Sequence, residues 1–361
     1  MKILHTGDVH LGSAMSGLPT EKAKLRKAEI LDGFRRLCAY ARENSVSAVI
    51  IAGDLFDENG ASASLRAEVL AAIAGAQPTY FFYVSGNHDD EFAADGDLPP
   101  NLFLFSKNHG WHCYELADNI TLTGIDTRNI RPTCYGALAL RQDRFNIVVM
   151  HGDVTRAQGQ GQERIELGLL QNKNIDYLAL GHIHIPTLQA ERLDGRGRYR
   201  YCGCLEGRGF DECGRRGCFQ LEIRDGKLVD EKFLSFAKRQ IVELRADVSA
   251  CESYYDVERA ALTALKDVSK EDIVKLVLYG RHKAGLRKDL PLLTARLTQN
   301  FFHAKTVDES RVFIDYKQFE KDLSERGEFV REVGRYEMNE EERAEILDVG
   351  LKALAGEEID L

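Results

Sequence analysis

The chain has 361 residues, more than one average domain, and a composition of 44% hydrophobic and 29% charged residues that is typical of globular proteins. No apolar run approaches the ~18 residues that predict a membrane span, and the first residues turn polar too soon for a signal peptide. We therefore expect a cytoplasmic protein with no membrane segment, whose eight cysteines are thiols.

The formal net charge of −9 is unevenly distributed along the chain. Residues 337–361 contain nine acidic and two basic residues, whereas residues 191–240 contain twelve basic and nine acidic ones. The acidity therefore belongs mainly to the C-terminal end, and the rest of the chain can carry a local basic face.

Short apolar runs alternate with amphipathic segments in the first part of the chain. Runs rich in Val, Ile and Leu predict strands at 1–8, 47–57, 79–90, 120–126, 145–153, 175–184 and 218–226. Apolar residues at helical spacing predict helices at 21–45 and 62–76. Helices between the early strands favour an α/β layered fold.

The pattern changes after about Arg239. It predicts strands at 240–250, 272–280 and 303–316, and helices at 255–267, 289–302 and 339–356. We therefore predict a catalytic domain at 1–238, a smaller α+β accessory or capping domain at 239–320 and an acidic helical tail at 321–361. The apolar stripe of the last helix fits packing on its own domain about as well as binding to a partner.

Five of the predicted strands end in side chains that can bind metals or transfer protons. These side chains are Asp8 and His10, Asp54, Asn87 and His88, His151, and His182 and His184. A lone histidine at such a place is more often structural than a ligand, but five coincidences are hard to explain that way. The carboxyl ends of strands are where open α/β sheets usually build their sites.

Carboxylate, amide and imidazole ligands without thiolate suit Mn²⁺, Fe²⁺ or Zn²⁺ rather than Ca²⁺. Two such ions ~3.5–4 Å apart clamp the attacking and leaving oxygens of a phosphoryl displacement. One carboxylate must then bridge the ions, and Asp54, alone at the end of its strand, is the natural candidate. The pattern predicts a dinuclear site.

This ordered set of residues resembles the calcineurin-like metallophosphoesterase superfamily. The stretches "HTGDVHLGS" and "AGDLFDEN" resemble the opening motifs of SbcD-type DNA repair exonucleases, and "YCGCLEGRGFDECGRRGC" resembles the segment that closes their catalytic domain. The resemblance covers roughly residues 1–235. It implies a metallophosphoesterase layered β-sandwich flanked by helices, followed by the accessory domain.

The resemblance also implies roles for single residues. One ion would be held by Asp8, His10, Asp54 and His184, and the other by Asp54, Asn87, His151 and His182. His88 would contact the scissile phosphate and help the leaving oxygen accept a proton, Asp89 would orient its ring, and a hydroxide activated by the ions would attack in line. Mn²⁺ is the expected metal, with Fe²⁺ or Zn²⁺ as alternatives. Archaeal and eukaryotic relatives often carry His at the position of Asp57, so the role of that position stays open.

Other features allow two interpretations. Arg208, Arg215 and Arg216 fit phosphate contacts about as well as a solvated loop. Cys202, Cys204, Cys213 and Cys218 lack the spacing of paired zinc knuckles, so small, half-buried thiols are favoured over a zinc site.

Together these features predict a metal-dependent DNA phosphodiester hydrolase, an exonuclease or endonuclease subunit for DNA repair. The resemblance implies an SMC-like ATPase partner and allows a homodimer. One alternative is a metallophosphoesterase that acts on small nucleotides or phosphoproteins, and another is a non-catalytic DNA-binding scaffold. The sequence leaves cleavage polarity and the native metal open.

Overall fold

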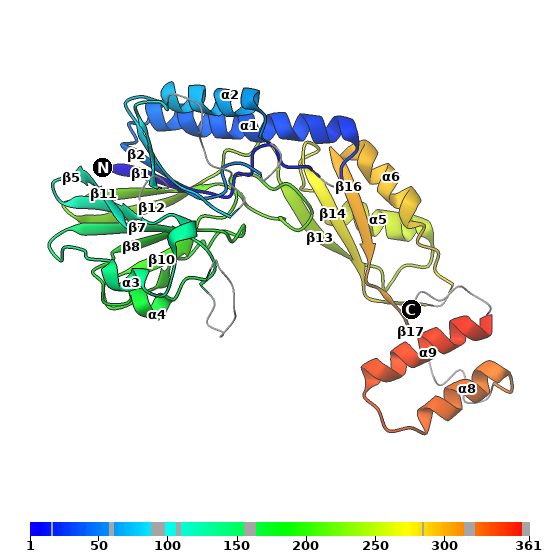
Figure 1. Ribbon diagram of the computed structural model, residues 1–361. Coiled ribbons are helices and arrows are strands. Elements are labelled where there is room, and N and C mark those ends of the chain that lie inside the picture. The colour runs from blue at the N-terminus through cyan, green and yellow to red at the C-terminus, as the bar shows by residue number, and fades with distance from the viewer. Residues whose placement is uncertain are drawn as a thin grey trace. The chain divides into compact units, whose positions relative to one another are not determined.

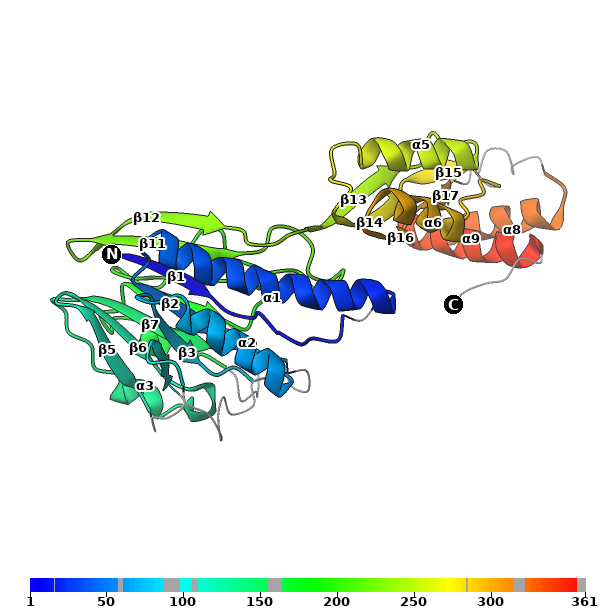
Figure 2. The same ribbon diagram turned by 90° about the horizontal axis from the view of Figure 1, so that it is seen from above.

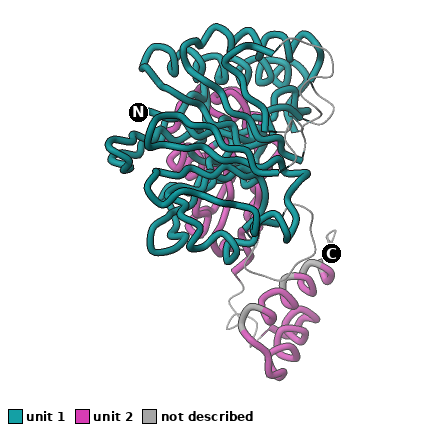
Figure 3. The backbone as a smooth tube through the Cα atoms, turned by 60° about the vertical axis from the view of Figure 1, so that its left-hand side comes forward, with its two compact units in different colours: residues 1–241 teal, residues 242–361 magenta. Residues whose placement is uncertain are grey.

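A computed structural model describes residues 1–15, 17–57, 61–87, 98–105, 110–154, 164–283, 285–313 and 322–355. The chain divides into two compact units, Met1–Ile241 and Val242–Leu361 (Figure 3). None of the described helices is both long and apolar enough to cross a membrane. The division lies close to the predicted 238/239 boundary, and a separate tail from residue 321 stays a prediction.

The first unit contains two six-stranded sheets. The first has the order β12-β11-β1-β2-β3-β4. Its strands are β1 (Lys2–Thr6), β2 (Ala48–Ala52), β3 (Tyr80–Val84), β4 (Leu102–Leu104), β11 (Cys218–Arg224) and β12 (Lys227–Leu234). β1 to β4 run parallel, and β11 pairs antiparallel with both β1 and β12.

The second sheet has the order β5-β6-β7-β8-β10-β9. Its strands are β5 (His112–Ala117), β6 (Ile120–Gly124), β7 (Phe145–His151), β8 (Tyr177–Gly181), β9 (Glu191–Arg192) and β10 (Arg198–Tyr201). Strands β6, β7, β8 and β10 are parallel, while β5 and β9 are antiparallel edges.

The central strands are buried on both faces, which explains their unbroken apolar runs. In β2, Ala48, Ile50 and Ala52 pack between the two sheets, while Val49 and Ile51 face the helices on the other side. Helices α1 (Thr20–Glu43) and α2 (Ala63–Ala74) cover that outer face and lie side by side (Figures 1 and 2).

Short helical turns cover the outer face of the second sheet. They are η2 (Thr127–Asn129), α3 (Cys134–Ala137) and α4 (Leu167–Leu170). Leu170 and Tyr135 join a cluster with Val148 and Met150 of β7, the residues that face away from the other sheet. The first unit is thus a β-sandwich with helices outside, and the α/β layered prediction is confirmed.

The second unit contains a three-stranded sheet and two groups of helices. β13 (Ile241–Asp247), which begins on the last residue of the first unit, pairs with β14 (Ile273–Tyr279), and β14 runs parallel to β16 (His303–Asp308). Helices α5 (Tyr254–Ala264) and α6 (Leu290–Asn300) share its core. A short pair, β15 (Arg281–Lys283) and β17 (Arg311–Phe313), and the helices α8 (Glu325–Gly334) and α9 (Glu340–Ala355) complete it. The predicted α+β character and last helix are confirmed.

Candidate metal centre

The predicted metal ligands that the structure describes lie at the carboxyl ends of parallel strands from both sheets. Asp8, Asp54 and Asn87 follow β1, β2 and β3, while His151 ends β7 and His182 and His184 follow β8. Hydrogen bonds join the sheets here: the His151 Nδ1 atom lies 2.9 Å from the Ala52 carbonyl oxygen, and the His182 N–H donates to the Asp8 carboxylate at 2.9 and 3.1 Å. The topology therefore assembles one site between the sheets.

The backbone at these strand ends is strained. Asp8, His10 and Asp54 adopt left-handed backbone conformations with φ of 48°, 48° and 47°, which residues other than glycine rarely adopt. Backbone hydrogen bonds from Asp8 to Gly53 (3.0 Å) and from His10 to Asp54 (2.9 Å) hold the two turns against each other. Such strain is typical of functional sites, where surrounding contacts fix unusual backbone geometry.

Two glycines make room for the site. A Cβ atom on Gly53 would lie 2.1 Å from His151 Nδ1, and one on Gly86 would lie 2.0 Å from Asp54 Oδ1. Neither position therefore tolerates a side chain unless the site moves apart.

His10 and His184 face each other with their Nε2 atoms 3.1 Å apart. The Nδ1 atom of each ring lies beside a carboxylate, at 3.3 Å from Asp57 Oδ1 for His10 and at 2.7 Å from Glu212 Oε1 for His184. A carboxylate accepts hydrogen bonds, so this geometry favours the tautomer with its proton on Nδ1 in both rings, which directs the Nε2 lone pair of each ring at the other ring. Two such lone pairs repel unless a cation or a proton lies between them.

His151 shows the same pattern at the other side of the site. Its Nδ1 donates to the Ala52 carbonyl, so its Nε2 lone pair faces Asn87 Oδ1 at 2.9 Å and Asp54 Oδ2 at 3.5 Å. Asp54 Oδ2 is also 3.5 Å from His10 Nε2. Acceptor atoms that converge in this way are typical of a cation site. The Asp54 Oδ2 atom lies within 3.5 Å of a histidine on each side of the site.

Among the described residues, two groups place ligand atoms within 4.8 Å of one another: Asp8, His10 and His184, and Asp8, Asp54 and His151. Asn87 adjoins the second group through its contact with His151, and the ring of His182 lies 5.2 Å from that of His151. These nitrogen and oxygen donors fit Mn²⁺, Fe²⁺ or Zn²⁺. His88 and Asp89 lie outside the described residues.

The structure adds Glu212, which the sequence interpretation missed. Glu212 is buried, and besides His184 it contacts Arg208, whose Nη2 lies 2.5 Å from its Oε1. Although burial acts to raise the pKa of Glu212, hydrogen bonds from His184 and Arg208 hold this pKa well below its usual value. The sequence offered only one hint, a carboxylate four residues after an arginine in the closing motif.

The three arginines predicted as phosphate contacts lie in different surroundings. Arg208 is mostly buried against Glu212, and Arg216 is buried with its Nη1 donating to the Arg215 carbonyl at 3.0 Å. The guanidinium of Arg215 lies over the ring of Phe233, 5.3 Å from its centroid.

The cysteine group contains free thiols. Cys202, Cys204 and Cys218 are buried, and burial raises their thiol pKa values. The described residues include no metal-ligand group built from these cysteines.

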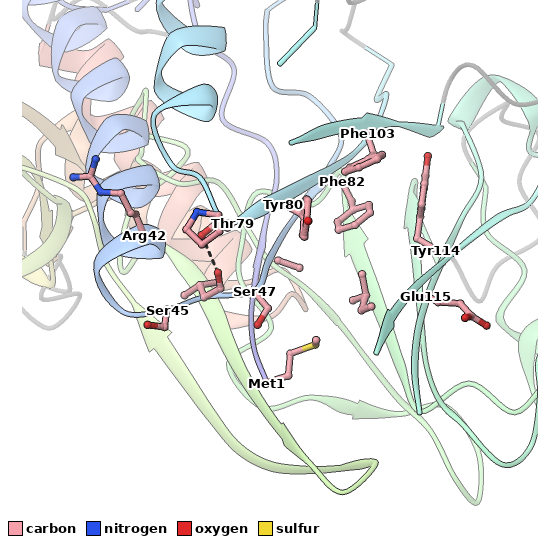
Figure 4. A pocket seen from close by; sticks show the side chains of 14 residues that line it. Met1, Arg42, Ser45, Ser47, Thr79, Tyr80, Phe82, Phe103, Tyr114 and Glu115 are labelled. Carbon is pink, nitrogen blue, oxygen red and sulfur yellow. Dashed lines mark hydrogen bonds between the residues drawn. The ribbon is translucent and has the colours of Figure 1, made fainter. Parts of the chain in front are cut away.

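A cavity of about 620 Å³ lies at the other end of the strands, where β2 and β3 begin. Tyr80, Phe82, Phe103 and Tyr114 gather along one side of it, and Arg42 approaches from the end of α1 (Figure 4). No predicted site residue lines this cavity, so it is separate from the candidate metal centre.

Comparisons with known proteins show which proteins the chain is similar to. The sequence profile of the calcineurin-like phosphoesterases matches residues 1–186. The chain is 25% identical to the SbcD subunit of the nuclease SbcCD from Escherichia coli K12, over 99% of both chains. It is 26% identical to the DNA double-strand break repair protein Mre11 of Methanopyrus kandleri, over 77% of this chain and 64% of that one. Among solved structures, a dimetal phosphatase from Danio rerio aligns with a TM-score of 0.45 and 10% identity, over 66% of this chain and 99% of that chain.

Proposed function

Because the chain belongs to the calcineurin-like phosphoesterase family, we propose that it hydrolyses the phosphodiester bonds of DNA as a repair nuclease subunit. The family assignment confirms the predicted metallophosphoesterase fold. The observation that carries the proposal is the set of facing acceptors at the strand ends, where His10, His184 and His151 direct lone pairs at one another or at oxygens. This arrangement suits cations more than any protein donor.

DNA is the proposed substrate because similarity to a nuclease subunit extends over both units and not only over the catalytic region. An enzyme for small phosphodiesters would have no evident use for the second unit. We propose that this unit helps to hold DNA or a partner subunit.

Two divalent cations, Mn²⁺ in the first place, are proposed to occupy the site. Asp8, His10, Asp54 and His184 would hold one ion, and Asp54, Asn87, His151 and His182 would hold the other. Bound there, the ions would polarise a phosphate and lower the pKa of water. Asn87 contributes a neutral oxygen, which limits the negative charge that the incoming phosphate meets.

The remaining chemistry belongs to side chains of this chain. His88 is proposed to donate a proton to the leaving oxygen, with Asp89 fixing its ring. The Ala52 carbonyl fixes the ring of His151 by accepting its Nδ1 proton, so this ring enters no proton transfer at that atom. Arg208, Arg215 and Arg216 stay proposed contacts to the DNA backbone, with Arg215 the most exposed of the three.

The relative's name describes a subunit of a larger nuclease, so we propose that this chain also works with a partner. The resemblance points to an SMC-like ATPase, acting in the cytoplasm.

The experiment that tests this function uses end-labelled linear duplex DNA with Mn²⁺. We expect the DNA to be shortened, the reaction to stop when EDTA removes the metal, and His88→Ala to slow turnover by about 10²–10⁴-fold. The matched control is His112→Ala, a histidine on β5, which should retain the activity.

Two outcomes would contradict the proposal. Hydrolysis of a small chromogenic phosphodiester with the DNA left intact would favour the small-substrate enzyme. DNA binding without hydrolysis of either substrate would favour the scaffold.

A further inference from the structure

Glu212 lies on the segment that crosses from the second sheet to the first. We define the crossing segment as residues 202–217, between β10 and β11. We propose that Glu212 is a positioning residue that fixes the tautomer and orientation of His184, so that His184 Nε2 can bind a cation. This inference rests on the proposed function, since it concerns a ligand of the same site.

Three atoms form a tight triangle behind the ring of His184. Glu212 Oε1 lies 2.7 Å from His184 Nδ1, Arg208 Nη2 lies 2.5 Å from Glu212 Oε1, and Arg208 Nη2 lies 3.0 Å from His184 Nδ1. The carboxylate oxygen can only accept a hydrogen bond, and the guanidinium nitrogen can only donate one. The imidazole Nδ1 can do either, depending on the tautomer.

Of the two neutral tautomers of His184, the triangle favours the one with its proton on Nδ1. If His184 Nδ1 carries the proton, Glu212 Oε1 accepts from both the imidazole and the guanidinium. If Nδ1 were bare and accepted from Arg208, its lone pair would face the carboxylate at 2.7 Å. The first pattern leaves the lone pair on Nε2, which faces His10 inside the site.

Glu212 is itself held on several sides. Its Oε2 accepts the Arg208 backbone N–H at 2.7 Å, and Arg208 Nη1 reaches Ser13 at 3.5 Å, on the loop that carries His10. The guanidinium of Arg208 balances the negative charge of Glu212. Glu212 can therefore orient the ring of His184 as a hydrogen-bond acceptor. A charged, buried pair of this kind is stable only when both partners are present.

The backbone of His184 is tied to the same segment. The Cys204 N–H donates to the His184 carbonyl at 3.0 Å. The crossing segment therefore forms hydrogen bonds with both the main chain and the ring of His184.

His10, which faces His184, also has a carboxylate behind its ring, but this contact is weaker. Its Nδ1 lies 3.3 Å from Asp57, whose side chain is 28% exposed, against 4% for Glu212. Glu212 is thus the better-placed carboxylate of the two, and its loss should affect metal binding more.

The test measures Mn²⁺ binding by calorimetry and by electron paramagnetic resonance, on the full chain without DNA. Glu212→Gln should weaken the binding of one ion by about 10- to 100-fold, as loss of a partner behind a ligating histidine does. Glu212→Asp should recover part of this loss.

The matched control is Glu206→Gln. Glu206 is a buried carboxylate of the same crossing segment that pairs with Arg26 and Arg36 and touches no site histidine. This variant should bind Mn²⁺ as the unchanged protein does. Equal loss in Glu206→Gln and Glu212→Gln would overturn the positioning role, because general damage to the segment would explain both.

A second measurement is made on the protein with Glu212 and Glu206 unchanged, so it does not depend on how those two variants fold. In the metal-free protein labelled with ¹⁵N-histidine, long-range ¹H–¹⁵N spectra should show His184 with its proton on Nδ1, the signal being identified by its absence in His184→Gln. A proton on Nε2 would refute the inference. If the unchanged protein binds no Mn²⁺, the proposed function fails instead, and the two failures are distinguishable.

Discussion

Asp54 contacts histidines from both sides of the candidate metal centre. Its Oδ2 is 3.5 Å from Nε2 of His10, on the loop after β1, and 3.5 Å from Nε2 of His151, at the end of β7. The residue is buried, so its charge is shielded from water and would be balanced best by cations bound at the site. A carboxylate in this position is suited to bridge two cations.

Replacing Asp54 by Ala should therefore remove or disorder both ions. We expect the Mn²⁺ stoichiometry, measured by calorimetry, to fall from two to less than one per chain. Asp176→Ala serves as the control, since Asp176 pairs with Arg196 away from the site and should leave metal binding unchanged. Retention of two full ions in Asp54→Ala would rule out the bridging role.

At the scale of elements, helix α1 is joined to the crossing segment and to the end of the first unit by buried charges. Glu29 Oε2 accepts from Arg26 Nη1 at 2.7 Å and from Arg239 Nε at 2.8 Å. Arg26 also donates to the Gly207 carbonyl at 2.9 Å and lies 3.0 Å from Glu206. The crossing segment, which carries Glu212, is thus anchored on the helix side as well as at the site.

Replacing Glu29 by Ala should lower the free energy of unfolding by about 3–5 kcal/mol, because two buried guanidinium groups, of Arg26 and Arg239, each lose a carboxylate partner. Denaturant unfolding followed by the fluorescence of Trp111, the single tryptophan, reports on the first unit. Glu21→Ala, which removes an exposed ion pair on the same helix, should change this free energy by less than about 0.5 kcal/mol. A loss below about 1 kcal/mol for Glu29→Ala would show that the cluster is dispensable.

At the scale of the whole first unit, a polar contact joins the two sheets away from the site. His5 of β1 lies with its Nδ1 2.9 Å from the Tyr177 hydroxyl of β8, and both residues are fully buried. Burial lowers the pKa of His5 to about 3, and the charge of Arg200 acts in the same direction. His5 is therefore neutral in the folded protein over the whole range in which an exposed histidine titrates.

This depressed pKa predicts how stability depends on pH. Below the ordinary histidine pKa of 6.5, the unfolded chain binds a proton at His5 that the folded chain does not. The free energy of unfolding should therefore fall with decreasing pH from about 6.5 towards 3, by at most about 1.4 kcal/mol per pH unit from this group.

The measurement compares the unchanged protein with His5→Gln, in EDTA, by Trp111 fluorescence. His5→Gln keeps a hydrogen-bonding group but cannot titrate. The difference in free energy of unfolding between the two proteins should therefore become smaller as the pH falls. Parallel pH profiles would contradict the predicted pKa.

The sequence by itself determined which residues can form the site. Parallel strands bring their carboxyl ends to one edge, so ligands such as Asp8, Asp54 and His151 had to gather wherever those strands became neighbours. The apolar runs and helical spacing also determined the layered fold. Strands that are buried on both faces are continuously apolar and do not alternate polar with apolar residues.

The tertiary structure alone decided which atoms face each other. His10 and His184 lie 174 positions apart, and their facing lone pairs depend on how two sheets pack. Glu212 was missed for the same reason: nothing in its local sequence shows that the crossing segment folds back onto His184. Residue types and spacings follow from local chemistry, whereas partners across the fold follow from packing between distant segments, which no local pattern encodes.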